Sequence, residues 1–193
     1  SSSWTLTALP LFVWMGEILF RTKLSENLFK GLAPWMSRLP GGLIHVNVVG
    51  CALFAAISGS SAATVATVGK MSIPELRKRN YPEKLLLGSL AGSGTLGLLI
   101  PPSIILIIYG VTVQESIAKL FIAGILPGIM IAIIFMLYVI IWSIINKKEM
   151  PTSNESFSFV EKIKGSKQLL PVITLITAVI GSIYAGIATA TEA

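Results

Sequence analysis

The sequence predicts an all-α integral membrane protein that crosses the bilayer several times. Of its 193 residues, 53% are hydrophobic and only 12% are charged, and the mean hydropathy is +0.80. A soluble domain carries roughly 25% charged residues. This chain therefore has too few charges to cover a water-facing surface, and much of its outside must face lipid. Long apolar stretches separated by basic polar ones indicate the same class.

The apolar stretches set the expected organisation of the chain. They cover about residues 4–20, 42–69, 85–110, 120–145 and 169–190. A helix needs roughly 20 apolar residues to cross the hydrocarbon core, so each stretch except the second fits one crossing. We expect a first part at 1–145, a cytoplasmic linker at 146–168, and the start of a second, inverted repeat at 169–193. Because apolar sequence runs almost to both ends, we expect the chain to be an internal fragment.

The basic residues predict the orientation. Fourteen of the fifteen lie in the polar stretches 21–41, 70–84 and 146–168, whereas 111–119 holds only Lys119. The positive-inside rule places the three basic stretches in the cytoplasm and 111–119 outside. The net charge of +6 is therefore interpreted as a topology signal, and no nucleic-acid partner is expected.

The stretch 42–69 presents a conflict that predicts a re-entrant hairpin. It begins and ends on the same side, yet its 28 residues are too few for two crossings, which would need about 40. In its middle lies Ser58-Gly59-Ser60-Ser61, a poor helix interior. We therefore expect a turn at 58–61. Irregular backbone at membrane depth is tolerated only where protein buries it or where it lines a wet cavity, so this turn is expected at a binding site.

The stretch 85–110 carries a second expected interruption. Several glycines precede the pair Pro101-Pro102, and these prolines leave backbone carbonyls without donors. An unwound segment with free carbonyls is how transporters coordinate a small cation such as Na⁺. Hydroxyl oxygens nearby come from Ser93, Thr95 and Ser103. The alternative for both interruptions is that small residues only allow close packing and that the prolines only kink a helix.

Other polar residues give weaker signals. Glu17 is either a functional intramembrane acid or the partner of Arg21 one turn later. His45, the only histidine, is expected to be a packed or wetted residue and not a ligand, and the single Cys51 is expected to be a small buried residue. No phosphate loop, zinc-ligand pair or Ser-His-Asp set is present, so an enzyme is not expected. The tryptophans expected to anchor the chain at the membrane interface are Trp4, Trp14, Trp35 and Trp142.

Several motifs together resemble one transporter family. The segment 54–64, Phe-Ala-Ala-Ile-Ser-Gly-Ser-Ser-Ala-Ala-Thr, resembles the first hairpin of the large membrane subunit of TRAP (tripartite ATP-independent periplasmic) transporters of the DctM type. The segment 94–103 is similar to that family's broken helix, and 109–112 and 120–128 continue the match. The segment 186–193 is similar to its Thr-Glu-Ala signature, with Ala190 where the family usually has Pro.

The resemblance implies an elevator-type transporter built from inverted repeats, in the bacterial inner membrane. It implies Na⁺-coupled import of an organic acid of the C4-dicarboxylate, keto acid or sialic acid class. It also implies two partners, a small membrane subunit and a periplasmic substrate-binding protein. The residues carried over to Na⁺ coordination are Ser58, Gly59, Ser60, Ser61, Gly92, Gly94, Thr95 and Pro101. Those expected at the substrate are Ser61, Thr64, Pro102 and Ser103. No cofactor beyond the coupling ion is expected.

Two other function classes stay open at this point. One is a Na⁺-coupled dicarboxylate carrier on a related scaffold that acts without a binding protein. The other is a non-transporting membrane scaffold subunit, in which the glycine and serine interruptions only pack helices.

Overall fold

The computed structural model describes residues 24–151 and 159–185, together with Pro10, Trp14, Glu17, Ile18, Arg21 and Thr22. Regular structure in these residues is helical throughout, which confirms the all-α class. The elements are α2 (Leu24–Met36), α3 (Ile44–Ser58), α4 (Ser61–Lys78), α5 (Glu83–Gly94), the 3-10 helix η1 (Thr95–Leu98), α6 (Ile104–Val113), α7 (Ile117–Ile145), α8 (Phe159–Ser166), the 3-10 helix η2 (Lys167–Leu169) and α9 (Leu170–Tyr184). Most of the predicted crossing at 4–20, and all of 186–193, lie outside the described residues.

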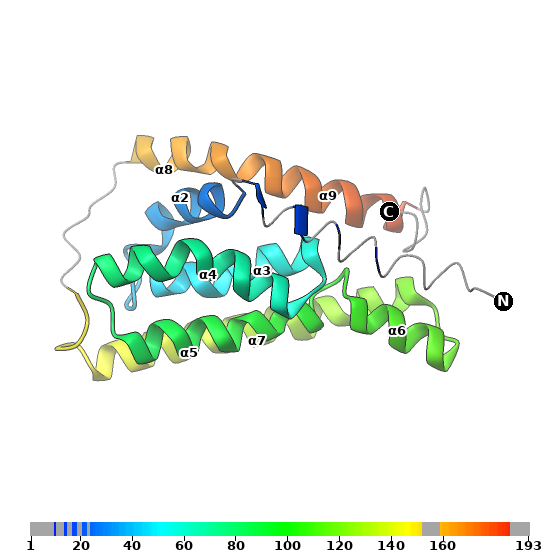
Figure 1. Cartoon of the computed structure of the whole chain (residues 1–193), viewed down its shortest axis with the longest axis horizontal. Helices are drawn as coiled ribbons and strands as arrows, with labels where there is room; N and C mark the ends of the chain where they lie inside the picture. Colours follow the sequence, from blue (N-terminus) through cyan, green and yellow to red (C-terminus); the bar gives the residue numbers. More distant parts are fainter. Residues whose placement is uncertain are drawn as a thin grey trace.

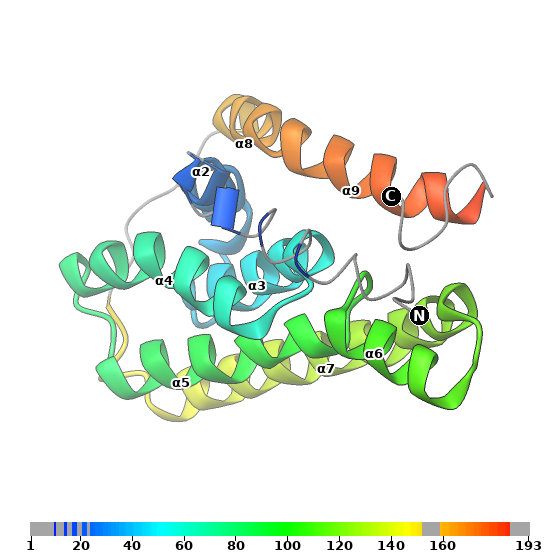
Figure 2. The ribbon, with the colours of Figure 1, turned by 45° about the vertical axis from the view of Figure 1, so that its right-hand side comes forward.

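The helices run along one long axis. Helices α5 and α7 lie side by side along one edge, and α8 with α9 forms a rod along the opposite edge (Figures 1 and 2). Helix α3 lies between them and contacts α2, α4, α5, α7 and α9. The α4–α5 connection and the end of α7 are at one end of the molecule, and the α6–α7 connection is at the other (Figure 1). The basic residues of 70–84 and of 147–148 are thus at the same end.

Among the described residues, two helices are long and apolar enough to cross a membrane. They are Ile117–Ile145 and Glu161–Ile183, with 29 and 23 residues. The first agrees with the predicted crossing at 120–145. Large apolar side chains are exposed along α7, among them Ile122, Leu126 and Ile141, as expected of a surface that contacts lipid. Helices Ile44–Ser58 and Ile104–Val113 are apolar but shorter.

Two stretches interpreted as polar connections contain helices instead. Helix α2 lies within 21–41 and α8 lies within 146–168. Helix α2 buries Leu28, Phe29 and Leu32 on one face, while Lys30 pairs with Glu26 in exposed positions. Charge alone marked these stretches as connections, but apolar residues four positions apart form an amphipathic helix. Helix α4 also continues to Lys78, so the connection to α5 is short.

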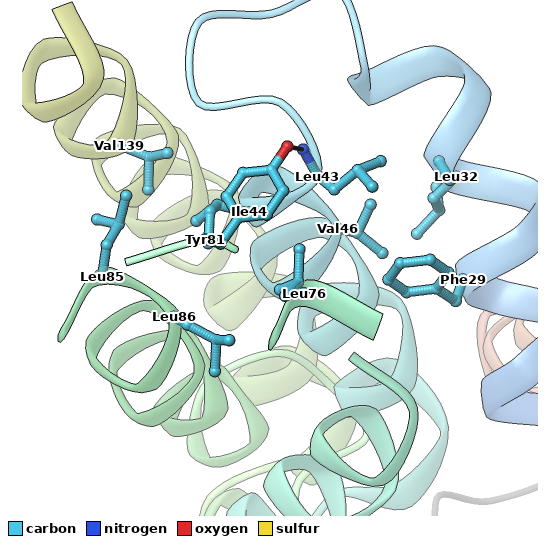
Figure 3. Packing of buried hydrophobic residues seen from close by; sticks show 11 residues of the cluster. Phe29, Leu32, Leu43, Ile44, Val46, Leu76, Tyr81, Leu85, Leu86 and Val139 are labelled. Carbon is cyan, nitrogen blue, oxygen red and sulfur yellow. Dashed lines mark hydrogen bonds between the residues drawn. The ribbon is translucent and has the colours of Figure 1, made fainter. Parts of the chain in front are cut away.

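The largest core cluster joins the hairpin to its neighbours at the basic end (Figure 3). Tyr81, in the connection after α4, accepts a hydrogen bond at its hydroxyl from the Leu43 backbone N–H at 3.1 Å. Gly42 has a positive φ of +50°, and a Cβ there would lie 2.5 Å from that hydroxyl. The side chains that close this cluster are Phe29, Leu32, Leu43, Ile44, Val46, Leu76, Tyr81, Leu85, Leu86 and Val139.

Candidate functional site

The turn of the helical hairpin lies where the sequence predicts it. Helix α3 ends at Ser58 and α4 begins at Ser61. Gly59 has a left-handed φ of +59°, and its N–H donates to the Ala55 carbonyl at 3.1 Å, which closes α3. Ser60 is extended and caps α4, since its hydroxyl accepts from the Ala63 N–H at 3.4 Å. Whether this hairpin is re-entrant in a membrane stays a prediction.

Besides Ser60, three hydroxyl groups lie around the tip, and they differ in what they contact. Ser58 Oγ lies 3.0 Å from Thr64 Oγ1, and Thr64 Oγ1 donates to the Ser60 carbonyl at 2.7 Å. Ser58 and Thr64 are fully buried, so they connect the two arms of the hairpin. Ser61 Oγ is also buried, but it has no hydrogen-bond partner in the part of the chain that the structure describes. A buried hydroxyl without a partner calls for an explanation, and a ligand supplies one.

The predicted broken helix is interrupted at 95–103. Helix α5 ends at Gly94, η1 follows, residues 99–103 are not helical, and α6 begins at Ile104. The Pro101-Pro102 peptide bond is cis. The Ser103 hydroxyl donates to the Leu98 carbonyl at 2.7 Å and so bridges the interruption.

The hairpin tip contacts this break directly. The Ile104 N–H donates to the Gly59 carbonyl at 3.2 Å. A Cβ on Gly59 would lie 2.7 Å from the Pro102 carbonyl oxygen, so only glycine fits there without displacing backbone. Two irregular segments that are far apart in the sequence therefore meet through main-chain atoms.

A second glycine brings the two segments equally close. A Cβ on Gly97 would lie 2.8 Å from the Ser60 carbonyl carbon and 2.8 Å from the Ser61 nitrogen. Gly94 lies against the same arm of the hairpin, where a Cβ would overlap Val65 Cγ2 at 1.9 Å. We refer to residues 58–61 as the hairpin tip, to 94–104 as the break, and to their contact as the tip–break contact.

Helix ends dominate the electrostatics of the tip–break contact. Helix α3 and η1 present C-terminal carbonyls there, and α4 and α6 present N-terminal N–H groups. C-termini attract cations and N-termini attract anions. Neither 51–69 nor 85–114 contains a charged residue. The arrangement can therefore bind a small cation and an anion through carbonyls, hydroxyls and N–H groups, the manner in which discontinuous helices bind ions.

Three of the residues predicted to bind Na⁺ do not face the hairpin tip. A Cβ on Gly92 would lie 3.5 Å from Phe135 of α7. Pro101 also lies towards α7, because a Cβ added to Gly124 of that helix would lie 3.7 Å from Pro101 Cδ. Thr95 is exposed, and its hydroxyl donates to the Gly92 carbonyl at 2.7 Å. Their contribution to ion binding stays a prediction.

The small residues of α7 that contact the break were not predicted as site residues from the sequence. A Cβ on Gly124 would lie 2.9 Å from the Leu99 carbonyl oxygen, and one on Gly128 would lie 2.8 Å from Ile100 Cγ1. Two glycines four residues apart in an apolar helix are a known signal for close packing in membranes. That spacing was sufficient to locate this contact.

Asn47 was also missed as a structural residue. It is fully buried in α3, and its Nδ2 donates to Ser89 Oγ at 3.0 Å and to the Leu86 carbonyl at 3.3 Å. The Ser93 hydroxyl lies within hydrogen-bond distance of the Asn47 carbonyl at 3.3 Å. These contacts hold α5, which leads into the break, against α3, which leads into the tip. A single amide side chain within an apolar run is the sequence feature that indicates such an interhelical contact.

Three further polar residues were singled out from the sequence, namely His45, Cys51 and Glu17. The His45 ring is buried, with Nε2 2.8 Å from the Pro40 carbonyl. Cys51 is buried and not bonded to another cysteine. Arg21 pairs with Glu17 at 2.9 Å, and both side chains are exposed. The packing predicted for His45 and Cys51 is confirmed.

Comparison with known proteins identifies the family. The family described as "Tripartite ATP-independent periplasmic transporter, DctM component" matches residues 1–193. The chain belongs to this family. Over 193 residues it is 36% identical to the C4-dicarboxylate TRAP transporter large permease protein DctM of Pseudomonas aeruginosa. The alignment covers 100% of this chain and 44% of that protein.

Other relatives of this DctM-family chain carry different substrate names. It is 34% identical over 189 residues to the ectoine/5-hydroxyectoine TRAP transporter large permease protein UehC of Ruegeria pomeroyi, covering 98% of this chain and 44% of the relative. It is 36% identical over 193 residues to the isethionate TRAP transporter permease protein DctMQ of Oleidesulfovibrio alaskensis, covering 99% and 30%. The chain thus spans less than half the length of these relatives. The predicted resemblance to the TRAP large permease is confirmed.

Proposed function

We propose that this chain forms the part of a TRAP transporter permease that binds Na⁺ and one side of an organic anion during import across the bacterial inner membrane. The tip–break contact is the observation that carries the proposal, because it brings two interrupted helices together without charged side chains. Membership of the DctM family supports transport over the role of a passive scaffold. The membrane class of the fold supports the location.

Na⁺ is the proposed coupling ion. Ser61 Oγ is the tip hydroxyl that has no hydrogen-bond partner among the described residues, and oxygen ligands of this kind suit hard cations. Carbonyls at the C-terminal ends of α3 and η1 supply further oxygens. Ser58 and Thr64 support the site by holding the two arms together. Of the proposed ligands, we place Ser61 first and Gly59, Ser60 and Gly94 around it.

The proposed substrate is a small organic anion. The N-termini of α4 and α6 lie at the tip–break contact, and such N-termini favour a carboxylate or another anionic group. The relatives are named for a C4-dicarboxylate, for ectoine and for isethionate, which supports a small acid and leaves its identity open. Residues proposed to lie at the substrate are Ser61, Thr64, Pro102 and Ser103.

Coupling follows if ion and substrate each stabilise the same arrangement of tip and break. Na⁺ between the helix C-termini would hold the two segments together and keep the two N-termini directed at the anion. Each ligand then raises the affinity for the other by the same factor.

We further propose that the hairpin is re-entrant, that the basic end is cytoplasmic, and that the chain moves as part of an elevator.

The proposed partners are a small membrane subunit and a periplasmic binding protein that delivers the anion. The test is uptake into proteoliposomes that contain the full-length permease with both partners, with an inward Na⁺ gradient or an equal K⁺ gradient. We expect uptake only with Na⁺ and the binding protein. Uptake with Na⁺ but without the binding protein would favour the simpler dicarboxylate carrier. Failure of a folded, reconstituted complex to take up any of the candidate acids would favour the scaffold.

A further inference from the structure

A groove on the side of the molecule is not used by the tip–break contact. It lies between α3, α5 and α7 and has a volume of about 290 Å³. Gly88 forms one edge, and a Cβ there would meet no atom within 4 Å, so the groove is open at this point. The residues that line it include Val48, Gly88, Ser89, Ile134, Phe135 and Tyr138.

The lining selects an apolar occupant. The lining contains one serine, Ser89. Its hydroxyl already donates to the Leu86 carbonyl at 3.0 Å and accepts a hydrogen bond from Asn47. Ile134 and Tyr138 are 52% and 58% exposed, so the groove opens on the apolar outer surface of α7. An apolar groove on a surface that faces hydrocarbon fits an acyl chain.

Basic side chains lie beyond the groove, towards the end of the molecule where α5 begins and α7 ends (Figure 2). Lys84 precedes Gly88 by one turn of α5, and Lys147 and Lys148 come directly after Asn146, the residue that follows α7. The start of α5 and the end of α7 are at the same end of the molecule (Figure 2). All three lysines are exposed. Their charge favours an anionic headgroup, because each lysine near a membrane surface attracts anionic lipid.

Two carboxylates lie near this basic rim and do not cancel its charge. Glu83 is engaged by the Arg77 guanidinium, with Nε 3.1 Å from Oε1. Glu149 directly follows the lysine pair and offsets one of its charges. The rim therefore keeps a positive charge next to an apolar groove.

We propose that this groove binds an acyl chain of an anionic phospholipid, whose headgroup phosphate contacts Lys84, Lys147 and Lys148. The basic end is cytoplasmic in the proposed function, so the lipid would belong to the inner leaflet. This placement rests on the proposed function, whereas lipid binding itself does not. A lipid seated there would contact both α3 and α5, the helices that lead to the tip and to the break.

The test uses the full-length permease with its small membrane subunit, in nanodiscs of phosphatidylcholine with increasing fractions of phosphatidylglycerol of the same acyl composition. Lipid that stays bound after release from the nanodisc is counted by native mass spectrometry. We expect retained phosphatidylglycerol to exceed phosphatidylcholine, and Gly88→Leu to remove it by filling the groove. Gly181→Leu is the matched control, since Gly181 lies in α9 and is equally open. Equal retention in both variants would overturn the proposal.

Replacing the three rim lysines by glutamine tests the headgroup. Each lysine lost should lower the preference for phosphatidylglycerol about fivefold, while an acyl chain still binds. Lys119→Gln, at the other end of the molecule, should leave it unchanged. An unchanged preference in the triple variant would contradict the role of the rim.

A photo-cross-linking residue in place of Tyr138 identifies the occupant. We expect a cross-link to lipid, whereas a cross-link to another segment of the permease or to the small subunit would overturn the proposal. Both measurements detect binding without transport, so a negative result here is distinguishable from a failure of Na⁺-driven uptake.

Discussion

Two close contacts in this molecule use glycine in different ways. Where α2 crosses α8 and the adjoining η2, a contact we call the α2–α8 crossing, a Cβ on Gly31 would lie 2.6 Å from Leu169 Cδ2 of η2 and 3.2 Å from the Gly165 carbonyl oxygen of α8. At the tip–break contact, a Cβ on Gly97 would meet main-chain atoms of the hairpin at 2.8 Å. A leucine side chain can rotate away, but backbone cannot without moving a helix end. The backbone contact at Gly31, at 3.2 Å, is also longer than those at Gly97, so we expect the α2–α8 crossing to tolerate change better than the tip–break contact does.

The two contacts also differ in how side chains support them. At the α2–α8 crossing, Trp35 Nε1 donates to Ser166 Oγ at 3.0 Å, and the Lys162 ammonium lies 5.3 Å from the centre of the Trp35 ring. The tip–break contact depends on fitted backbone and on the hydrogen bond from Ile104 to Gly59. A contact that is defined by shape and contains a buried hydroxyl, Ser61 Oγ, with no partner among the described residues is suited to gain stability from an ion.

The largest effect is expected from Gly97→Ala. The added methyl group would displace the Ser60–Ser61 backbone, and overpacking of this kind costs about 1–3 kcal/mol. We expect Na⁺-driven uptake to fall by about tenfold or more, because the same displacement moves the proposed ion ligand. Uptake in proteoliposomes and thermal unfolding in detergent measure the two effects. Gly181→Ala, which adds a methyl group in open space, is the control, and wild-type uptake by Gly97→Ala would refute a rigid contact.

An intermediate effect separates the two serines of the hairpin. Ser58→Ala removes the hydroxyl that lies 3.0 Å from Thr64, and we expect a loss of about 0.5–1.5 kcal/mol of stability. Ser61→Ala removes a hydroxyl without a partner among the described residues, so stability without Na⁺ should be unchanged or slightly higher. Thermal unfolding in Na⁺-free buffer measures both. Equal destabilisation by the two substitutions would contradict the different roles assigned to them.

A smaller effect is expected at the α2–α8 crossing. Trp35→Phe removes the hydrogen bond to Ser166 and keeps an aromatic ring beneath Lys162. Since Trp35 is 44% exposed, the expected loss is about 0.5 kcal/mol, with uptake close to that of the wild type. Unfolding and uptake measured on the same preparation check this. A loss of uptake as large as that of Gly97→Ala would show that the two contacts are equally critical.

The smallest effect concerns pH. The hydrogen bonds and charge of Arg77 lower the pKa of Glu83 from its ordinary value of 4.5. A carboxyl group with a lowered pKa stabilises the folded state above its ordinary pKa, and this contribution disappears as the pH falls through the lowered value. Glu83→Gln should therefore slightly flatten the loss of stability below about pH 4.5, measured by unfolding against pH. Both side chains are exposed, so an effect comparable to that of Ser58→Ala would be unexpected.

The sequence located the two interruptions because their residues have strong local preferences. Glycine next to serines at 58–61 ends one helix and caps another, and Pro101-Pro102 cannot continue a helix. The family resemblance added Gly92 and Thr95 to the ion site; in the structure Gly92 faces Phe135 and Thr95 is exposed, and their role stays a prediction. Which side of a helix faces a neighbour depends on tertiary packing, and local preference contains no information about it.

The helices α2 and α8 were missed for a related reason. Their basic residues identified the stretches 21–41 and 146–168 as outside the membrane, but charge does not exclude an amphipathic helix. The apolar residues of α2 needed a partner before their burial could be recognised, and that partner lies more than a hundred residues later in the chain. Gly97 is likewise one of several glycines that precede Pro101-Pro102 in the sequence, and only the fold reveals that it touches the hairpin tip.

The claim that Na⁺ binds at the tip–break contact is tested most directly by a Na⁺ titration of the unfolding temperature of the full-length permease. Wild-type protein and Ser61→Ala are compared, with K⁺ keeping the ionic strength constant. Because an ion that binds the folded state stabilises it, Na⁺ should raise the unfolding temperature of the wild type. Ser61→Ala should need about tenfold more Na⁺ for the same rise. Identical titrations for the two proteins, or an equal rise with K⁺ alone, would contradict a Na⁺ site at Ser61.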